Sequence, residues 1–406
     1  MKLKSIIKSL NSNERIIKIA IFQILTLSQT IVLNKLFTNF WSKDEAGVYF
    51  LVLSISFIIS SLSFNSLNQW LSKSASQSND FEKKTSDNIY ILLSFLLVVT
   101  CCFFYYIEEF SYFTVCVFSL SEVVKLYLNT LYNAKSKLMN LINFTLLNGV
   151  IKITAIVMLV FIYPGISIES TILVMSMFSV VIGLLYGRQE LPSYTRDKSN
   201  LNFNALFLFV IPLSLSSGLS IFREQYPRIM FSRLQDISSI SDFSMMIFIS
   251  TLVPISIQLL ITTSFTPVYY KEFIINAKVA NNKLKRVGLY AMICSLMYAV
   301  LFIFFGKTLI VLFSNESFSS LSNMIIVLVI SYAIFVRSNI RTLYLFACSS
   351  TGMLLVINLI VSITSLIIYE SMYKYYGFSG VALSLASMNL LFSIACELII
   401  KIKGFK

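Results

Sequence analysis

Six charged side chains lie more than two residues inside the ends of long apolar segments of this chain, and they are its best candidates for chemistry. They are Glu122, Lys125, Lys152, Arg337, Arg341 and Glu397. If those segments cross a bilayer, a charge near the centre costs roughly 2.5–3.5 kcal/mol on insertion scales. Such a residue is therefore paired, faces water, or extends to the membrane surface. Because four of the six are cations, the set favours an anionic ligand over a cationic one.

Glu122 and Lys152 are spaced to meet inside the membrane. They lie on neighbouring apolar segments joined by the short loop 133–142. Each is about ten residues from that loop, which on antiparallel helices places both roughly 15 Å deep, near the midplane. The sequence leaves two interpretations open: a structural ion pair, or a coupling or substrate site.

Lys125 and Arg337 are related by an offset of 212 residues, and each precedes a tyrosine, Tyr132 or Tyr344, by seven residues. This places both cations in the cytoplasmic half of the bilayer. Facing a shared cavity, they and Lys152 would attract a phosphate group, for which arginine is a good bidentate ligand. Alternatively, the two cations extend to the inner membrane surface.

The same offset superposes further residues, which indicates an internal repeat. Thr130-Leu131-Tyr132 falls on Thr342-Leu343-Tyr344, and Tyr163, Gly165 and Ser167 fall on Tyr375, Gly377 and Ser379. A weaker match relates residues 46–49 to residues 240–243. The repeat predicts two pseudo-symmetric lobes of six helices each, residues 1–187 and 204–406, joined by a cytoplasmic loop at 188–203.

Composition sets the fold class. Hydrophobic residues make up 57% of the 406 residues and charged residues only 13%, whereas soluble domains have about 25% charged residues. Twelve apolar runs predict an all-α integral membrane protein with about twelve transmembrane helices. They cover residues 16–37, 47–71, 88–107, 110–131, 143–163, 168–187, 204–222, 243–268, 287–305, 321–346, 352–370 and 378–400.

The distribution of lysine and arginine predicts that both termini are cytoplasmic. With the N-terminus inside, 21 of the 32 lysines and arginines fall in cytoplasmic segments and 7 in outer loops, including a predicted outer loop at 222–242. This bias follows the positive-inside rule. The net charge of +13 therefore reflects membrane topology and contact with lipid head groups, and it does not indicate nucleic-acid binding.

Several kinds of chemistry are excluded. The chain has no histidine, no phosphate-binding loop of the G-x-x-x-x-G-K-[ST] type, and six cysteines that lie in apolar segments without a CxxC pair. We therefore expect no catalytic residues, no metal, no cofactor and no enzyme activity. Two further expectations concern local structure. Pro212 and Pro254 interrupt their helices, and Glu397 pairs with Lys401 at the surface while Arg341 lies near the interface.

Three segments resemble the polysaccharide-biosynthesis (O-antigen) flippases of the multidrug/oligosaccharidyl-lipid/polysaccharide exporter superfamily. They are residues 41–51 (WSKDEAGVYFL), residues 267–271 (PVYYK) and residues 376–383 (YGFSGVAL). The likeness extends over the whole chain, including the two-lobe plan. It departs after the seventh helix, where Pro227-Arg228 and Ser241-Asp-Phe243 replace the family's usual Asp-Arg pair and Gly-x-Tyr.

The resemblance implies a multi-pass protein of the bacterial inner membrane that moves an undecaprenyl-diphosphate-linked oligosaccharide, such as an O-antigen unit for lipopolysaccharide, to the periplasmic leaflet. It implies alternating access and partners among membrane lipids and other glycan-assembly membrane proteins. Three alternatives stay open: an ion-coupled multidrug exporter of the same superfamily, a membrane polysaccharide polymerase, and a structural membrane protein.

Overall fold

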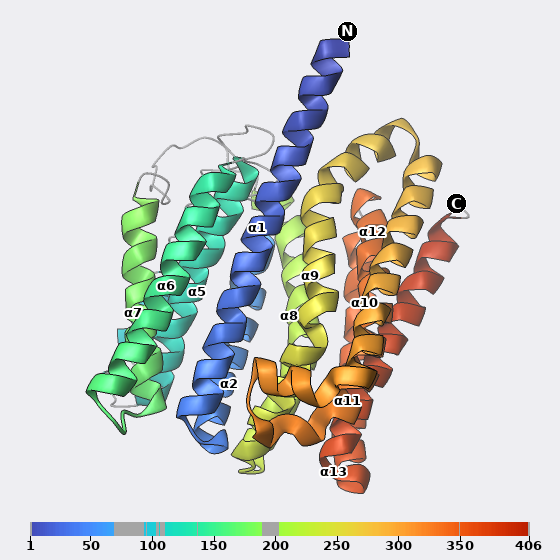
Figure 1. The fold of residues 1–406 in the computed structure, drawn as a ribbon. Coiled ribbons are helices and arrows are strands. Elements are labelled where there is room, and N and C mark those ends of the chain that lie inside the picture. Colours follow the sequence, from blue (N-terminus) through green and yellow to red (C-terminus); the bar gives the residue numbers. More distant parts are fainter. Residues whose placement is uncertain are drawn as a thin grey trace. The chain divides into compact units, whose positions relative to one another are not determined.

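The computed structural model describes residues 2–68, 93–94, 96–102, 105, 110–135, 137–188, 203–348 and 350–404. Almost everything described is helix (Figure 1). Eight of the described helices are long and apolar enough to cross a membrane. Residues 72–87 between the second and third predicted spans, most of the predicted span 88–107 and nearly all of the inter-lobe loop 188–203 lie outside the described residues.

The chain forms two compact units, residues 40–221 and residues 1–39 with 222–406. The first holds α2 (Lys43–Ser60), a π-helical turn (Ser61–Asn65), α5 (Phe110–Ala134), α6 (Leu138–Ile162), α7 (Ile168–Gly187) and the start of α8 (Phe203–Arg233). The second holds α1 (Lys2–Phe40) up to residue 39, the end of α8, α9 (Ile237–Ile275), α10 (Ala277–Phe313), a 3₁₀ turn (Glu316–Leu321), α11 (Ser322–Arg341), α12 (Leu343–Ala347) and α13 (Thr351–Gly404). The lobes of the sequence repeat remain a prediction.

A helix start recurs at the 194-residue offset of the sequence repeat. α2 and α9 begin 194 residues apart, at Lys43 and Ile237. The N-caps recur as well. The Ser42 side chain accepts a hydrogen bond from the Glu45 backbone N–H, and the Asp236 carboxylate accepts one from the Ser239 N–H. Similar local signals therefore begin corresponding helices in both halves of the chain.

Two glycines at corresponding positions make the turns between paired helices. Gly165, between α6 and α7, has φ +91°, and Gly377 has φ +59° and ψ −143°. Gly377 divides α13 into two helices, as the separate apolar runs 352–370 and 378–400 predict. Only glycine adopts these backbone angles at low cost.

In unit 40–221, α5 packs against α7 and α2, and α6 packs against α7. Gly183 and Gly187 allow α7 to approach α5 closely. A Cβ at Gly183 would lie 2.4 Å from Val124 Cγ1, and one at Gly187 would lie 2.8 Å from Leu128 Cδ2. This small-xxx-small pattern, common where membrane helices meet, fixes how α5 is rotated and so where Glu122 and Lys125 point.

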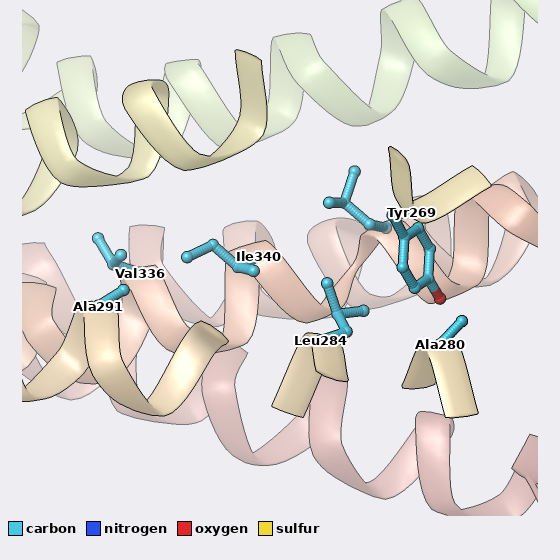
Figure 2. Close-up of a cluster of buried hydrophobic side chains, with 7 residues drawn as sticks. Tyr269, Ala280, Leu284, Ala291, Val336 and Ile340 are labelled. Carbon is cyan, nitrogen blue, oxygen red and sulfur yellow. The ribbon is translucent and has the colours of Figure 1, made fainter. Parts of the chain in front are cut away.

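In the other unit, α9, α10 and α11 pack around a buried cluster of apolar side chains. Figure 2 shows Ala280, Leu284 and Ala291 of α10 with Val336 and Ile340 of α11 and Tyr269 of α9. α10 and α11 also approach closely at Gly288, where a Cβ would lie 3.3 Å from the Arg337 carbonyl oxygen. The backbone of Arg337 is thereby held against α10.

The predicted outer loop at residues 222–242 is wrong. α8 continues to Arg233 and α9 begins at Ile237, so only three residues separate them. The charged residues lower the hydropathy of this segment to a value typical of a loop. Arg223 and Arg228 are nevertheless buried in the helix packing, with 0% and 5% of their surface exposed. α8 and α9 continue through Pro212 and Pro254, as membrane helices can, so neither proline ends its helix.

Gly377→Ala should lower the melting temperature of the detergent-purified protein. Forcing a side chain into the Gly377 conformation costs about 1–3 kcal/mol. Gly352→Ala, in the same helix, is the matched control, because at both positions an added Cβ meets nothing within 4 Å and only Gly377 has a positive φ. Equal melting temperatures for the two variants would contradict this description of the turn.

Candidate functional site

One carboxylate in unit 40–221 is shared between two lysines. Glu122 Oε1 lies 3.3 Å from Lys152 Nζ, and Glu122 Oε2 lies 3.0 Å from Lys125 Nζ. Glu122 and Lys125 are three residues apart on α5 and therefore lie on the same helix face, while Lys152 reaches them from α6. We call these three residues the Glu122 cluster.

The members of the Glu122 cluster differ in exposure. The side chains of Lys152 and Glu122 are 7% and 12% exposed, and that of Lys125 is 30% exposed. Tyr49 of α2, itself buried, lies within electrostatic reach of Glu122. Lys152 thus neutralises Glu122 inside the helix packing, and Lys125 lies at the accessible edge.

The charge of the Glu122 cluster sets what it can do. One carboxylate between two ammonium groups leaves a net charge of +1 when all three are ionised. Lys125 donates one hydrogen bond to Glu122, and an ammonium group has three donors. The arrangement can therefore attract an anionic group to the Lys125 side while Glu122 holds that lysine in place.

Arg337 lies in the other unit, on α11. Its side chain is partly buried, and its Nε atom has no hydrogen-bond partner among the described residues. Because Lys125 and Arg337 belong to different units, their facing one cavity stays a prediction.

Arg341 and Glu397 form an ion pair between α11 and α13. The predicted pair of Glu397 with Lys401 is therefore wrong: Glu397 meets a cation on a neighbouring helix, not the one at i+4. Arg341 is only 5% exposed, so the protein holds it and it does not reach out to the interface. Sequence spacing favours local partners, and the packing of α11 on α13 overrides it.

Sequence reasoning missed a charged segment within α8. The Arg228 side chain donates a 2.6 Å hydrogen bond from Nε to Ser244 Oγ of α9 and another from Nη1 to Gln225. The Tyr226 hydroxyl donates to Glu370 Oε1 of α13 at 2.6 Å. The buried guanidinium of Arg223 lies 5.9 Å from the ring centroid of Phe335.

One signal could have revealed this segment. The 194-residue offset that relates residues 46–49 to 240–243 also places Arg223, Glu224 and Arg228 on Gln29, Thr30 and Asn34. Those three are part of a polar stripe on the first helix. A segment whose counterpart lies in a membrane helix is itself expected to be membrane helix.

No family model and no curated protein matches the chain. Several solved structures match it. An outward-facing multidrug resistance MATE family transporter of the MOP superfamily has a TM-score of 0.68 and 14% identity over 97% of this chain and 96% of its own. The lipid II flippase MurJ, in an inward closed conformation, has a TM-score of 0.67 and 13% identity over 94% of this chain and 86% of its own. A MATE transporter from Vibrio cholerae has a TM-score of 0.65 and 11% identity over 95% and 94%.

The chain has the fold of MOP-superfamily transporters and flippases. This confirms the predicted all-α integral membrane protein with a twelve-helix plan. These neighbours are transporters and flippases, and the expectation that this chain is not an enzyme stays a prediction. At identities of 11–14%, the likeness establishes the fold and does not identify the substrate.

Removing Glu122 should destabilise the protein more than removing either lysine. Glu122→Gln leaves Lys152 buried without its carboxylate, which costs on the order of 3–5 kcal/mol. Lys152→Met leaves Glu122 paired with Lys125, and Lys125→Met leaves Glu122 paired with Lys152, so both should melt closer to wild type. Thermal unfolding in detergent measures all three. A Glu122→Gln variant as stable as Lys125→Met would show that the shared carboxylate is not structural.

Proposed function

We propose that this protein is a flippase for an undecaprenyl-diphosphate-linked oligosaccharide, an O-antigen unit or a related repeat unit. It moves the lipid from the cytoplasmic to the periplasmic leaflet of the bacterial inner membrane by alternating access. The observation that carries the proposal is the net positive Glu122 cluster within helices α5 and α6. The fold shared with a lipid II flippase supports it.

The electrostatics suit a diphosphate head group. A diphosphate can cross hydrocarbon only if the protein replaces the hydration of its negative charge. Lys125 offers an ammonium group at the accessible edge of the Glu122 cluster, with Lys152 behind it. Arg337 would supply a bidentate second contact from the other half of the repeat.

No nucleotide is used in the proposed cycle. The sequence carries no phosphate-binding loop, so the energy comes from an ion gradient or from consumption of the glycan after translocation. The partners are the lipid-linked oligosaccharide, the surrounding membrane lipids and other glycan-assembly membrane proteins.

A multidrug exporter is the second candidate, favoured by the fold shared with MATE multidrug transporters. Such a protein would bind cationic drugs at acidic side chains. In this chain two membrane carboxylates lie beside two cations each: Glu122 beside Lys125 and Lys152, and Glu224 within electrostatic reach of Arg223 and Arg228. Both sites repel a cationic ligand, which favours the flippase.

Deleting the gene should abolish surface glycan while its lipid-linked precursor continues to be made. The precursor should then accumulate on the cytoplasmic side, where a membrane-impermeant sugar-oxidising reagent added to intact cells does not reach it. Normal surface glycan in a strain without a second such transporter would contradict the function. If that strain made normal surface glycan and became sensitive to cationic drugs, the result would favour the multidrug exporter.

Complementing the deletion strain with variants tests the site. Lys125→Ala and Arg337→Ala should each insert normally and restore much less surface glycan than wild type. Arg337→Lys should restore an intermediate amount, because it keeps the charge and loses the bidentate fork. Lys401→Ala, which removes an exposed cation of α13, is the matched control and should restore the wild-type level. Wild-type export by the double variant of Lys125 and Arg337 would remove both from the site.

A further inference from the structure

Arg223 is a buried cation whose donors have no acceptor in the described chain. Its side chain is 0% exposed, and Nε, Nη1 and Nη2 are all buried without a hydrogen-bond partner among the described residues. Arginine remains protonated in proteins, so the group carries a full charge. Burying a charge with no hydrogen bond is among the costliest arrangements in a protein interior.

The surroundings of Arg223 add donors and aromatic rings. Its guanidinium carbon lies 5.9 Å from the ring centroid of Phe335 on α11 and 5.7 Å from that of Phe392 on α13. The hydroxyl groups of Tyr332 and Tyr369 are within its electrostatic reach. Both hydroxyls are also buried and without a hydrogen-bond partner among the described residues.

None of the described acceptors near Arg223 makes a hydrogen bond to it. Gln225 and Ser244 accept hydrogen bonds from Arg228, and Glu370 accepts one from Tyr226. Glu224, the next residue on the helix, lies within electrostatic reach of Arg223 and of both tyrosine hydroxyls, but no hydrogen bond joins it to any of them in the described chain. It lowers the local charge, but with Arg228 also nearby the three charges of this segment sum to +1.

We propose that Arg223, Tyr332 and Tyr369 form a binding site for a small monovalent anion of the chloride type. A cation and two hydroxyl groups without acceptors are the complement of one anion. The Phe335 and Phe392 rings and the complete burial of Arg223 limit the ligand to a small ion, because a diphosphate would require α8 to separate from α11 and α13. The site is distinct from the Glu122 cluster and does not depend on the proposed lipid substrate.

The anion would have a mechanical consequence. α8 contributes Arg223, α11 contributes Tyr332 and α13 contributes Tyr369, so a bound ion joins three helices of one unit. It would also cancel the net charge of the α8 segment. Stability of this unit should therefore depend on the identity of the anion in the medium.

The test compares thermal unfolding of the detergent-purified protein in sodium chloride and in sodium gluconate at equal ionic strength. We expect the melting temperature of the wild type to rise by several degrees with chloride, in a saturable manner, and bromide to act similarly. Arg223→Gln should abolish the difference between the two salts. Tyr332→Phe, which keeps the ring, should raise the half-saturating chloride concentration several-fold. Arg233→Gln, which removes an exposed cation from the last turn of α8, is the matched control and should keep the chloride response.

Two outcomes would overturn the proposal. One is a wild-type melting temperature that is the same in both salts, which needs no variant to be measured. The other is an Arg223→Met variant that is more stable than wild type in both salts. That result would identify Arg223 as an unsatisfied buried charge.

Discussion

The carboxylate of Glu122, shared between Lys125 and Lys152, is the interaction on which this account depends. In a hydrocarbon environment each of these charges would be costly alone, and together they are tolerated because two helices bring them into contact. The cluster therefore requires α5 and α6 to be adjacent and antiparallel, with their charges at matched depth. The glycines of α7 that admit Val124 and Leu128 hold α5 in the rotation that the contact needs.

The same constraint is met differently in the other unit. Arg341 is paired across helices with Glu397, and Arg228 is satisfied by the neutral side chains of Gln225 and Ser244. Arg223 has neither kind of partner among the described residues and contacts aromatic rings instead. In this nearly all-helical apolar fold, the candidate sites therefore lie at the few buried charges, and each of these charges contacts side chains of its own unit.

Much of the fold could be predicted because hydrocarbon imposes simple rules. Backbone groups must bond within their own helix, so apolar runs are helices, and the break at Gly377 falls between two such runs. The contact of Glu122 with Lys152 followed from counting residues back from a short loop. Depth along a helix is fixed by its rise per residue, so no knowledge of packing was needed.

The failures came where packing decides. The segment 222–233 is helix although its arginines lower the hydropathy, because side chains of α9, α11 and α13 surround them. Glu397 takes Arg341 from another helix in preference to Lys401 on its own. From the sequence, Lys125 is predicted to face a cavity and its contact with Glu122 is not predicted, although the spacing of three residues allows that contact.

Reconstitution of the purified protein into lipid vesicles tests the central claim most directly. The vesicles would carry an undecaprenyl-diphosphate-linked oligosaccharide with a fluorescent sugar, and a membrane-impermeant quencher would report its leaflet. We expect the protein to equilibrate the lipid between leaflets without nucleotide, and Lys125→Ala to slow this movement. Movement no faster than in protein-free vesicles, from a preparation that transports a cationic dye, would contradict the account and identify a drug exporter.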